Sequence, residues 1–343
     1  MARKKIVYVI GAGFSAGLGF PTIGNLLPKV WRRLEKAGLA NDLSRVIQFH
    51  HPSFNASNVK TYPNIEQLLS EMEANEQLFA SSRTATGTFD SVKLSEVRQD
   101  LLLEIAVWFH ELQKLALAKR PDWLTQLSDE MKRDKAQVIS FNWDLVLDEL
   151  LFGDELDRGS YGFDRERNKV RLIKPHGSLN WYEGEQVDFL KGSLKFKLAG
   201  VADSEDEGVF AFSPYRAPVS SKRSYMPLII PPVYSKQFKG STFERLWRET
   251  VAVVSTATEV RFLGYSLAPA DFHARFILRC GFHNQEEGAL DKLGHRLSPT
   301  GRSEITIVDP CSDGSVAERI NETVGWNGDF HQKTVEQWMK TRS

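Results

Sequence analysis

Short apolar runs along the 343-residue chain alternate with longer segments whose apolar positions follow the period of a helix. The first run, residues 5–10 (KIVYVI), is rich in β-branched residues, which predicts a buried parallel strand. Five similar runs follow it, at residues 136–141, 170–174, 227–231, 259–263 and 304–309. Because these runs are separated by helical segments, we expect an α/β fold with a Rossmann-like, doubly wound parallel sheet.

The segment between the first two predicted strands is mainly helical in pattern. IGNLLPKVWRRLEKAGL, which starts at Ile23, has apolar residues at helical spacing, and Pro28 predicts that the helix begins or bends near it. Residues 41–63 are polar and rich in turn-forming residues, which predicts a loop. Residues 64–131 carry successive amphipathic patterns without a strand signal, so we expect consecutive helices there.

The chain is long enough for one large α/β domain with an ample core. We expect a single domain over residues 1–343, with a helical insertion at about 41–134. A second excursion, at about 183–226, is mixed in pattern and contains an acidic run, so we expect it to be irregular or β-rich.

Charge balance and cysteine content exclude several classes of protein. The 44 basic and 44 acidic residues cancel, the pI is about 7.1, and neither nucleic acid nor a membrane surface is an expected partner. Cys280 and Cys311 are far apart, which predicts no disulfide framework and no zinc site. Because we find no secretory signal and no apolar run near the ~18 residues of a membrane helix, we expect a cytoplasmic, metal-free protein.

The stretch VYVIGAGFSAGLGFPT, residues 7–22, permits several interpretations. Gly11, Gly13 and Ala16 fit the dinucleotide pattern G-x-G-x-x-G/A, in which glycines let the backbone approach a pyrophosphate. That pattern normally has an acidic residue about twenty positions later, at the end of a second strand. Residues 35–55 contain no such strand. Taken alone, the glycines indicate no more than a tight turn between a strand and a helix.

Residues 13–17 also fit the G-x-S-x-G pattern that presents a nucleophilic serine in hydrolases, here Ser15. In those enzymes a strand upstream of the serine leads into the loop that donates part of the oxyanion hole. Ser15 lies too close to the start of the sequence for such a strand. The hydrolase interpretation is therefore disfavoured.

Polar clusters follow several of the other predicted strands, namely SFNWD (140–144), KPHGS (174–178), FLGYSLAPAD (262–271) and IVDP (307–310). In a doubly wound sheet the ligand site forms where the carboxyl ends of the strands meet, so we expect these clusters to lie together. Taken with the glycine loop, and in this order along the chain, they resemble the motifs of the sirtuin superfamily. Phe141 stands where glutamine is usual in that family.

The resemblance implies NAD as the substrate and gives roles to particular residues. It implies that the cofactor is bound by Gly11, Ala12, Gly13, Ser15, Thr22, Gly264, Ser266 and Asp309. It implies catalytic roles for Asn142, Asp144 and His176. By the same analogy, Asp309 reads the adenine ribose and Asp144 binds the nicotinamide carboxamide.

The chemistry of these side chains supports some of the roles and leaves alternatives. His176 is the expected general base, because imidazole has an unperturbed pKa near neutrality. The amide of Asn142 can position water or the ribose, although asparagine is also a favoured N-cap for the following helix LVLDELL. Asp144 would equally stabilise the first turn of that helix. We expect Asp271 and His273 to cap a helix near the mouth of the site.

The chain departs from the sirtuin deacylases in two ways. Two isolated cysteines cannot build the zinc module that paired C-x-x-C motifs hold in those enzymes. The loop that reads Gly19-Phe-Pro-Thr also lacks the Asp and Arg that follow in the family. A helical insertion that begins PNIEQLLSEME takes the place of the zinc module, a layout similar to the bacterial sirtuin-like NADases of anti-phage defence.

We therefore expect an NAD+ hydrolase that cleaves the nicotinamide–ribose bond and acts as an effector of anti-phage defence. Two alternatives stay open: an NAD-dependent protein deacylase without zinc, and a non-catalytic module that senses NAD or ADP-ribose. A permanently active NADase would kill its host. The resemblance therefore also implies control through homo-oligomerisation or through a separate regulatory protein, such as an ATPase or a nucleic-acid sensor.

Overall fold

The structure is a computed structural model that describes residues 4–79, 91–163, 169–183, 194–196, 209–214, 219, 226–230, 241–269 and 271–342. Its main sheet has six parallel strands in the order β3-β2-β1-β7-β8-β9. Their bounds are β1 Ile6–Ile10, β2 Gln137–Ser140, β3 Arg171–Ile173, β7 Glu259–Leu263, β8 Glu304–Val308 and β9 Asp329–His331. Counted along this sheet alone, the order is 3-2-1-4-5-6, which confirms the expected Rossmann-like, doubly wound fold.

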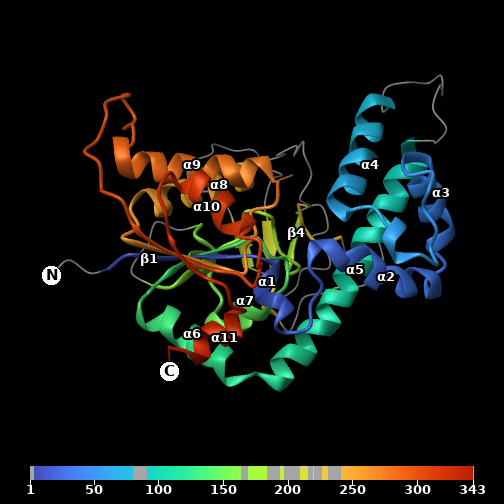
Figure 1. Ribbon diagram of the computed structural model, residues 1–343, viewed down its shortest axis with the longest axis horizontal. Coiled ribbons are helices and arrows are strands. Elements are labelled where there is room, and N and C mark those ends of the chain that lie inside the picture. Colours follow the sequence, from blue (N-terminus) through green and yellow to red (C-terminus); the bar gives the residue numbers. More distant parts are fainter. Residues whose placement is uncertain are drawn as a thin grey trace.

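Helices cover both faces of this sheet, which is why its strands read as nearly continuous apolar runs. Figure 1 shows α8, α9 and α10 over one face and α6 and α11 over the other. Their bounds are α6 Asp122–Arg133, α8 Ser241–Ser255, α9 Phe272–Glu287, α10 Ser315–Val324 and α11 Val335–Lys340. β1 lies between β2 and β7 inside the sheet, and all of its residues are buried.

Four helices, called the helical group below, stand beyond the carboxyl edge of the sheet, on the right in Figure 1. They are α2 Ile23–Lys36, α3 Ala40–His50, α4 Ile65–Phe79 and α5 Ser91–Lys119. The chain enters the group from β1 through the short α1 (Ala12–Ala16) and returns to β2 through α6. The helices expected at 64–131 are therefore confirmed as α4, α5 and α6. Within the described residues, no helix has both the length and the apolar character that a bilayer crossing requires.

The loop predicted at 41–63 is wrong in its first part. Residues 41–50 all belong to α3, whose apolar side chains Leu43, Val46 and Ile47 are buried at helical spacing among polar neighbours. α2 begins before Pro28, at Ile23, because the Thr22 N–H donates to the Asn25 side-chain oxygen (3.1 Å) and so fixes an earlier helix start. The alternative, a bend near Pro28, stays a prediction.

The strand predicted at 227–231 is also wrong. Residues 226–230 run beside the loop that follows β3 and make an isolated antiparallel bridge to it. The Ile230 N–H donates to the His176 carbonyl there (2.8 Å). The prolines at both ends of the predicted run have no N–H for a strand ladder, which disfavours its inclusion in the sheet. The sixth strand of the sheet is instead β9, a short edge strand that the apolar pattern did not predict.

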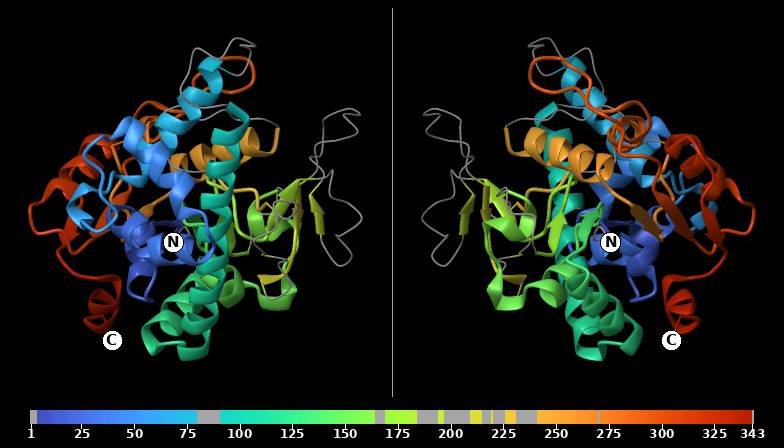
Figure 2. Two further views of the ribbon diagram at one scale, coloured as in Figure 1. Left: turned by 90° about the vertical axis from the view of Figure 1, so that its right-hand side faces the viewer. Right: turned by 90° about the vertical axis from the view of Figure 1, so that its left-hand side faces the viewer.

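A second sheet is small and antiparallel, with the order β4-β6-β5. Its strands are β4 Trp181–Glu183, β5 Leu194–Phe196 and β6 Val209–Ala211. Figure 2 shows it at one side of the molecule, with the C-terminal elements at the other. These strands fall within or beside the excursion expected at 183–226, and most of that range lies outside the described residues.

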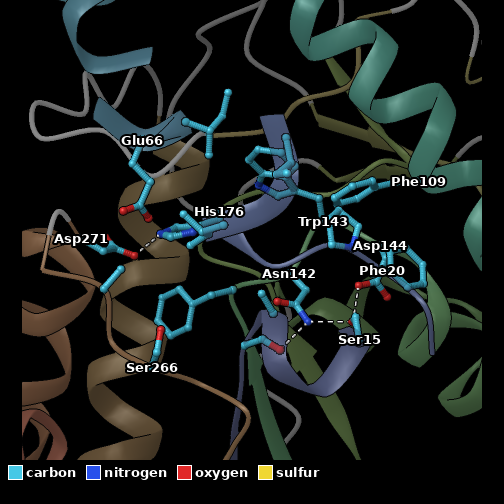
Figure 3. A pocket seen from close by; sticks show the side chains of 18 of the residues that line it. Ser15, Phe20, Glu66, Phe109, Asn142, Trp143, Asp144, His176, Ser266 and Asp271 are labelled. Atoms are coloured by element: carbon cyan, nitrogen blue, oxygen red, sulfur yellow. Dashed lines mark hydrogen bonds and ion pairs between the residues drawn. The ribbon is translucent and has the colours of Figure 1, made fainter. Parts of the chain in front are cut away.

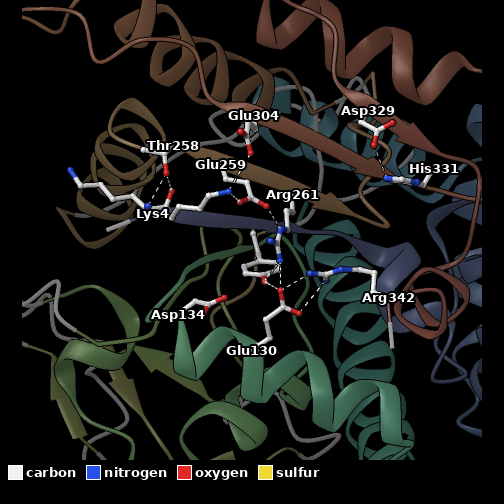
Figure 4. A network of polar contacts seen from close by, with 12 residues as sticks. Lys4, Glu130, Asp134, Thr258, Glu259, Arg261, Glu304, Asp329, His331 and Arg342 are labelled. Carbon is white, nitrogen blue, oxygen red and sulfur yellow. Dashed lines mark hydrogen bonds and ion pairs between the residues drawn. The ribbon is translucent and has the colours of Figure 1, made fainter. Parts of the chain in front are cut away.

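An ion network connects α6 and the end of the chain to two inner strands of the sheet (Figure 4). Arg261 on β7 donates to the Tyr8 hydroxyl on β1 (2.7 Å) and also to Glu130 on α6. Arg342, which follows α11, donates to the same carboxylate (2.9 Å). Burial alone would raise the pKa of Glu130, but the hydrogen bonds from Arg342 and Arg261 outweigh it and hold that pKa below its ordinary value.

The substitution Glu130→Gln is predicted to lower the free energy of unfolding at neutral pH by about 1–3 kcal/mol, because the two guanidinium groups lose their charged acceptor. A lowered pKa in the folded state means that this stabilisation is complete above the ordinary value of 4.5. It is lost as the pH falls through the folded pKa. Denaturant unfolding should therefore show a clear gap between variant and wild type at neutral pH that narrows in acid.

Glu336→Gln is the matched control, because it breaks an exposed ion pair with Lys340 one helical turn away (2.7 Å). Its expected effect is below about 0.5 kcal/mol at either pH. Equal effects of the two substitutions would contradict a stabilising role for the network around Glu130.

Candidate active site

A cavity with about 900 Å³ of empty space opens at the carboxyl edge of the main sheet. Residues that follow β1, β2, β3 and β7 form one wall: Gly11, Ala12, Ser15, Phe141, Asn142, Trp143, Asp144, His176, Tyr265, Ser266, Ala268 and Asp271. The other wall comes from the helical group and the loop before it: Phe20, Pro21, Ile23, Leu26, Ile65, Glu66, Leu69, Ile105 and Phe109. Its position is that of a small-molecule site in a doubly wound sheet.

The loops after β1 and β7 pack directly against each other beside this cavity. The Gly13 N–H donates to the Gly264 carbonyl (2.8 Å), and a Cβ on Gly13 would lie 2.9 Å from the Cα of Gly264. A Cβ on Gly264, whose φ is +59°, would lie 2.2 Å from the nitrogen of Phe14. Glycine is therefore required at both positions by the contact between the loops, independently of any ligand.

The side chain of Asn142 has a fixed orientation. Its Nδ2 donates to the Gly11 carbonyl (2.9 Å) and to Ser15 Oγ (3.0 Å). The carbonyl can only accept, and Ser15 donates its own proton to Asp144 (2.7 Å), so both contacts require the amide nitrogen. The two amide protons are thereby used, and Oδ1 is the atom that Asn142 can offer to a ligand. The helix-capping alternative is wrong, because α7 (Val146–Leu151) begins farther along the chain.

Asp144 is buried and holds the same loop in place. One carboxylate oxygen accepts from Ser15, and the other accepts from the Val146 N–H at the start of α7 (3.2 Å). The expected contribution to the start of this helix is therefore confirmed. Burial raises the pKa of the Asp144 carboxyl, against the opposing effects of nearby Lys174 and of the hydrogen bond from Ser15.

His176 pairs with a carboxylate that the sequence analysis did not assign to the reaction. Its Nε2 lies 3.1 Å from Asp271 Oδ2, and both side chains are buried. Asp271 also caps α9, as expected, by accepting from the Ala274 N–H (3.2 Å). With Asp271 ionised, its carboxylate can only accept, so Nε2 carries the proton and Nδ1 is the nitrogen that can take one up. The two residues belong to separate motifs, so nothing in their spacing indicated the pair.

Aromatic contacts fix the position of the imidazole ring. Phe141 stacks on Tyr265, with ring centroids 4.7 Å apart, and meets His176 edge-on at 4.9 Å. Phe141 therefore has a packing role beside His176. Trp143 lines the cavity, whereas Trp181 is fully buried in the core.

A buried ammonium group joins the loops that follow β2 and β3. Lys174 is fully buried, and its Nζ donates to the Asp144 carbonyl (2.8 Å), to Asp148 (3.0 Å) and to Ser178 Oγ (2.6 Å). Ser178 in turn donates to Asn180 (2.7 Å). These bonds set the position of the loop carrying Asn142 relative to the loop carrying His176.

The fold brings most of the predicted site residues together. Seven of them line the cavity: Gly11, Ala12, Ser15, Asn142, Asp144, His176 and Ser266. Gly13 and Gly264 form the adjoining loop contact. Thr22, before α2, and Asp309, after β8, are not among the lining residues, and their roles stay predictions. Asp309 accepts from the Cys311 N–H (2.9 Å), and burial raises its pKa.

The cavity has an acidic character. Among the described residues that line it, Asp144, Asp271 and Glu66 are carboxylic acids, and none is Lys or Arg. Figure 3 shows the Glu66 side chain lying beside the pair formed by His176 and Asp271. No group of three or more His, Cys, Asp or Glu side chains in the described part of the chain is placed to hold a metal ion.

Solved sirtuin structures align with nearly the whole of this chain, at low sequence identity and low TM-score. No protein-family model and no curated protein matches it. Sir2 with a p53 peptide and NAD+ aligns at 12% identity, covering 99% of this chain and 92% of its own, with a TM-score of 0.38. A second sirtuin structure, titled as the structural basis of sirtuin substrate affinity, aligns at 13% identity. The alignment covers 99% of this chain and 93% of that one, with a TM-score of 0.40. These low values do not assign the chain to a family.

Gly264→Ala is predicted to destabilise the protein more than Gly19→Ala does, although both glycines have positive φ, +59° and +95°. Backbone strain of roughly 1–2 kcal/mol applies to both. A Cβ at Gly19 meets nothing within 4 Å, whereas one at Gly264 overlaps the backbone of the β1 loop. Thermal and denaturant unfolding of the two variants would measure the difference. Equal destabilisation would contradict the requirement for close loop packing.

Proposed function

We propose that the protein hydrolyses NAD+ at the bond between nicotinamide and ribose, giving nicotinamide and ADP-ribose. One arrangement carries the proposal: the buried His176–Asp271 pair and the oriented amide of Asn142 line one cavity at the carboxyl edge of a Rossmann sheet. The resemblance of the motifs that contain these residues to sirtuin motifs supports it.

The chemistry requires little covalent help from the protein. Cleavage of an N-glycosidic bond passes through an oxocarbenium-like state, which water can attack without a strong protein nucleophile. Asn142 Oδ1 is proposed to accept a hydrogen bond from a ribose hydroxyl or from that water. His176 takes the proton of the water, and Asp271 holds the imidazole in the required tautomer and stabilises it once protonated.

The dinucleotide is proposed to lie across the loops after β1 and β7. Ala12 and Ser266, from these two loops, both line the cavity and would meet the pyrophosphate, with Ser15 beside them. The nicotinamide ribose would then lie near His176. Asp309, at the end of β8, is proposed to accept from the hydroxyls of the adenine ribose.

A zinc-free deacylase is the second candidate, and one observation favours it. The helical group lines the cavity with apolar residues, among them Phe20, Leu26 and Phe109, which could pack against the aliphatic stem of an acyl-lysine. A module that only senses NAD or ADP-ribose is disfavoured, because binding alone does not need a buried imidazole held by a carboxylate.

The biological setting is proposed from the sequence resemblance alone. The protein would act in the cytoplasm as an effector of anti-phage defence. Its activity would be controlled by homo-oligomerisation or by a separate protein, such as an ATPase or a nucleic-acid sensor. Direct binding to nucleic acid is not part of the proposal.

Incubation of the purified protein with NAD+, with and without an acetyl-lysine peptide, separates the three candidates. A hydrolase is expected to release nicotinamide and ADP-ribose without the peptide, and a deacylase to require it. A sensing module would bind NAD+ by calorimetry and release nicotinamide in neither mixture. The hydrolase proposal is refuted if no nicotinamide is released without the peptide, both with the protein alone and after candidate partner proteins are added.

His176→Ala is predicted to lower turnover by about 10²–10⁴-fold, the usual effect of losing a general base. Asn142→Ala should lower turnover by roughly a hundredfold or more while NAD+ affinity changes little, because the pyrophosphate is held by other residues. His283→Ala, an exposed position on α9, is the matched control and should behave as wild type. More than half of the wild-type turnover in His176→Ala would remove this residue from the mechanism.

A further inference from the structure

Glu66 is the one ionisable side chain that the described residues of the helical group contribute to the cavity. It lies in the first turn of α4, where its N–H donates to the Asn64 side chain (2.8 Å), and it is 4% exposed. Its neighbours on the same wall, among them Ile65 and Leu69, are apolar. The helical wall of the cavity is therefore hydrophobic except at this carboxylate.

The Glu66 carboxylate is directed at the proposed reaction centre. Figure 3 shows it beside the imidazole of His176 and the carboxylate of Asp271. Glu66 also acts on the nearby phenol of Tyr265. Burial raises the pKa of Tyr265 well above its ordinary value, and the charges of Asp271 and Glu66 raise it further. Glu66, on α4, thus meets residues from the loops after β3 and β7 at one point.

Glu66 and Asp271 lie close together, and two ionised carboxylates at that point repel each other unless a positive group lies between or near them. Together with Asp144, the two acids give the lining a negative character, with no Lys or Arg among its described residues. Such a cavity favours a ligand group that is positively charged or becomes so.

We propose that Glu66 is a catalytic residue that contacts the nicotinamide ribose and stabilises the positive charge developing on it, an inference that rests on the proposed NAD+ hydrolysis. When the C–N bond breaks, its electron pair leaves with nicotinamide, and the positive charge of the pyridinium ring passes to the ribose. Water then forms the new C–O bond, and its proton goes to His176 and on to solvent. Glu66 exchanges no proton in this step and acts as a carboxylate, by electrostatic attraction and by accepting from a ribose hydroxyl.

The kinetic test compares three substitutions on α4. Glu66→Gln, which keeps the shape and removes the charge, is expected to lower the rate of nicotinamide release by roughly 10²-fold or more. Glu66→Asp keeps the charge and should retain more activity than the glutamine variant. Glu71→Gln removes an equal charge from the same helix, at a position bonded to His51 (2.9 Å) outside the cavity, and should match wild type.

A binding test separates a direct contact from a structural role. In a His176→Ala background, which blocks turnover, the protein with Glu66 is expected to bind NAD+, with its cationic ring, more tightly than NADH, whose ring is neutral. Glu66→Gln should reduce this preference by about tenfold or more, since a charge beside the ribose also attracts the cationic nitrogen that joins the ring to that ribose. The melting temperatures of all variants show whether each protein is folded. If Glu66→Gln is not folded, Glu66→Asp takes its place in the binding comparison.

The outcomes separate the two proposals. If the wild type releases nicotinamide and Glu66→Gln stays within twofold of it, Glu66 has no catalytic role while the hydrolase proposal stands. If the wild type releases none, the hydrolase proposal fails, and the NAD+ and NADH affinities still test Glu66. An unchanged preference between NAD+ and NADH in Glu66→Gln overturns the direct contact in either case.

Discussion

The geometry of the cavity depends on the buried ammonium group of Lys174. This group donates to the loop after β2, to Asp148 on α7 and to Ser178 in the loop after β3. A buried charge is stable only while its partners stay in place, so neither loop can move without leaving the ammonium unsatisfied. The side chains of Asn142 and His176 are thereby held at a fixed separation, although none of these three hydrogen bonds involves either side chain.

The opposite side of the site is set by packing rather than by charge. Gly13 and Gly264 allow the loops after β1 and β7 to touch, and this contact places Ser266 and Asp271 beside the cavity. The helical group then provides an apolar second wall, which strengthens the electrostatic interactions inside. Polar groups therefore come from the sheet edge and the apolar surroundings come from the helices, with Glu66 as the exception.

The parts of the site that sequence predicted well are those determined by local rules. A strand that ends in a polar cluster delivers that cluster to the carboxyl edge of a parallel sheet, so the cavity-lining positions of His176, Asn142 and Ser15 followed from the chain itself. The parts that failed were cases in which tertiary contacts override a local pattern. α3 is helical because Leu43, Val46 and Ile47 pack inward. The run at 227–231 has an apolar strand pattern but pairs with the His176 loop instead.

The sequence by itself determined the doubly wound fold class and the position of most predicted site residues at the cavity, because these follow from periodicity and from the end of each strand. Only the tertiary structure decided which atoms those residues present. The pairing of His176 with Asp271, the orientation of the Asn142 amide and the approach of Glu66 each join segments far apart in the chain. Directional contacts between distant segments leave no periodic trace in a single sequence, and they exist only once the sheet and the helical group have packed.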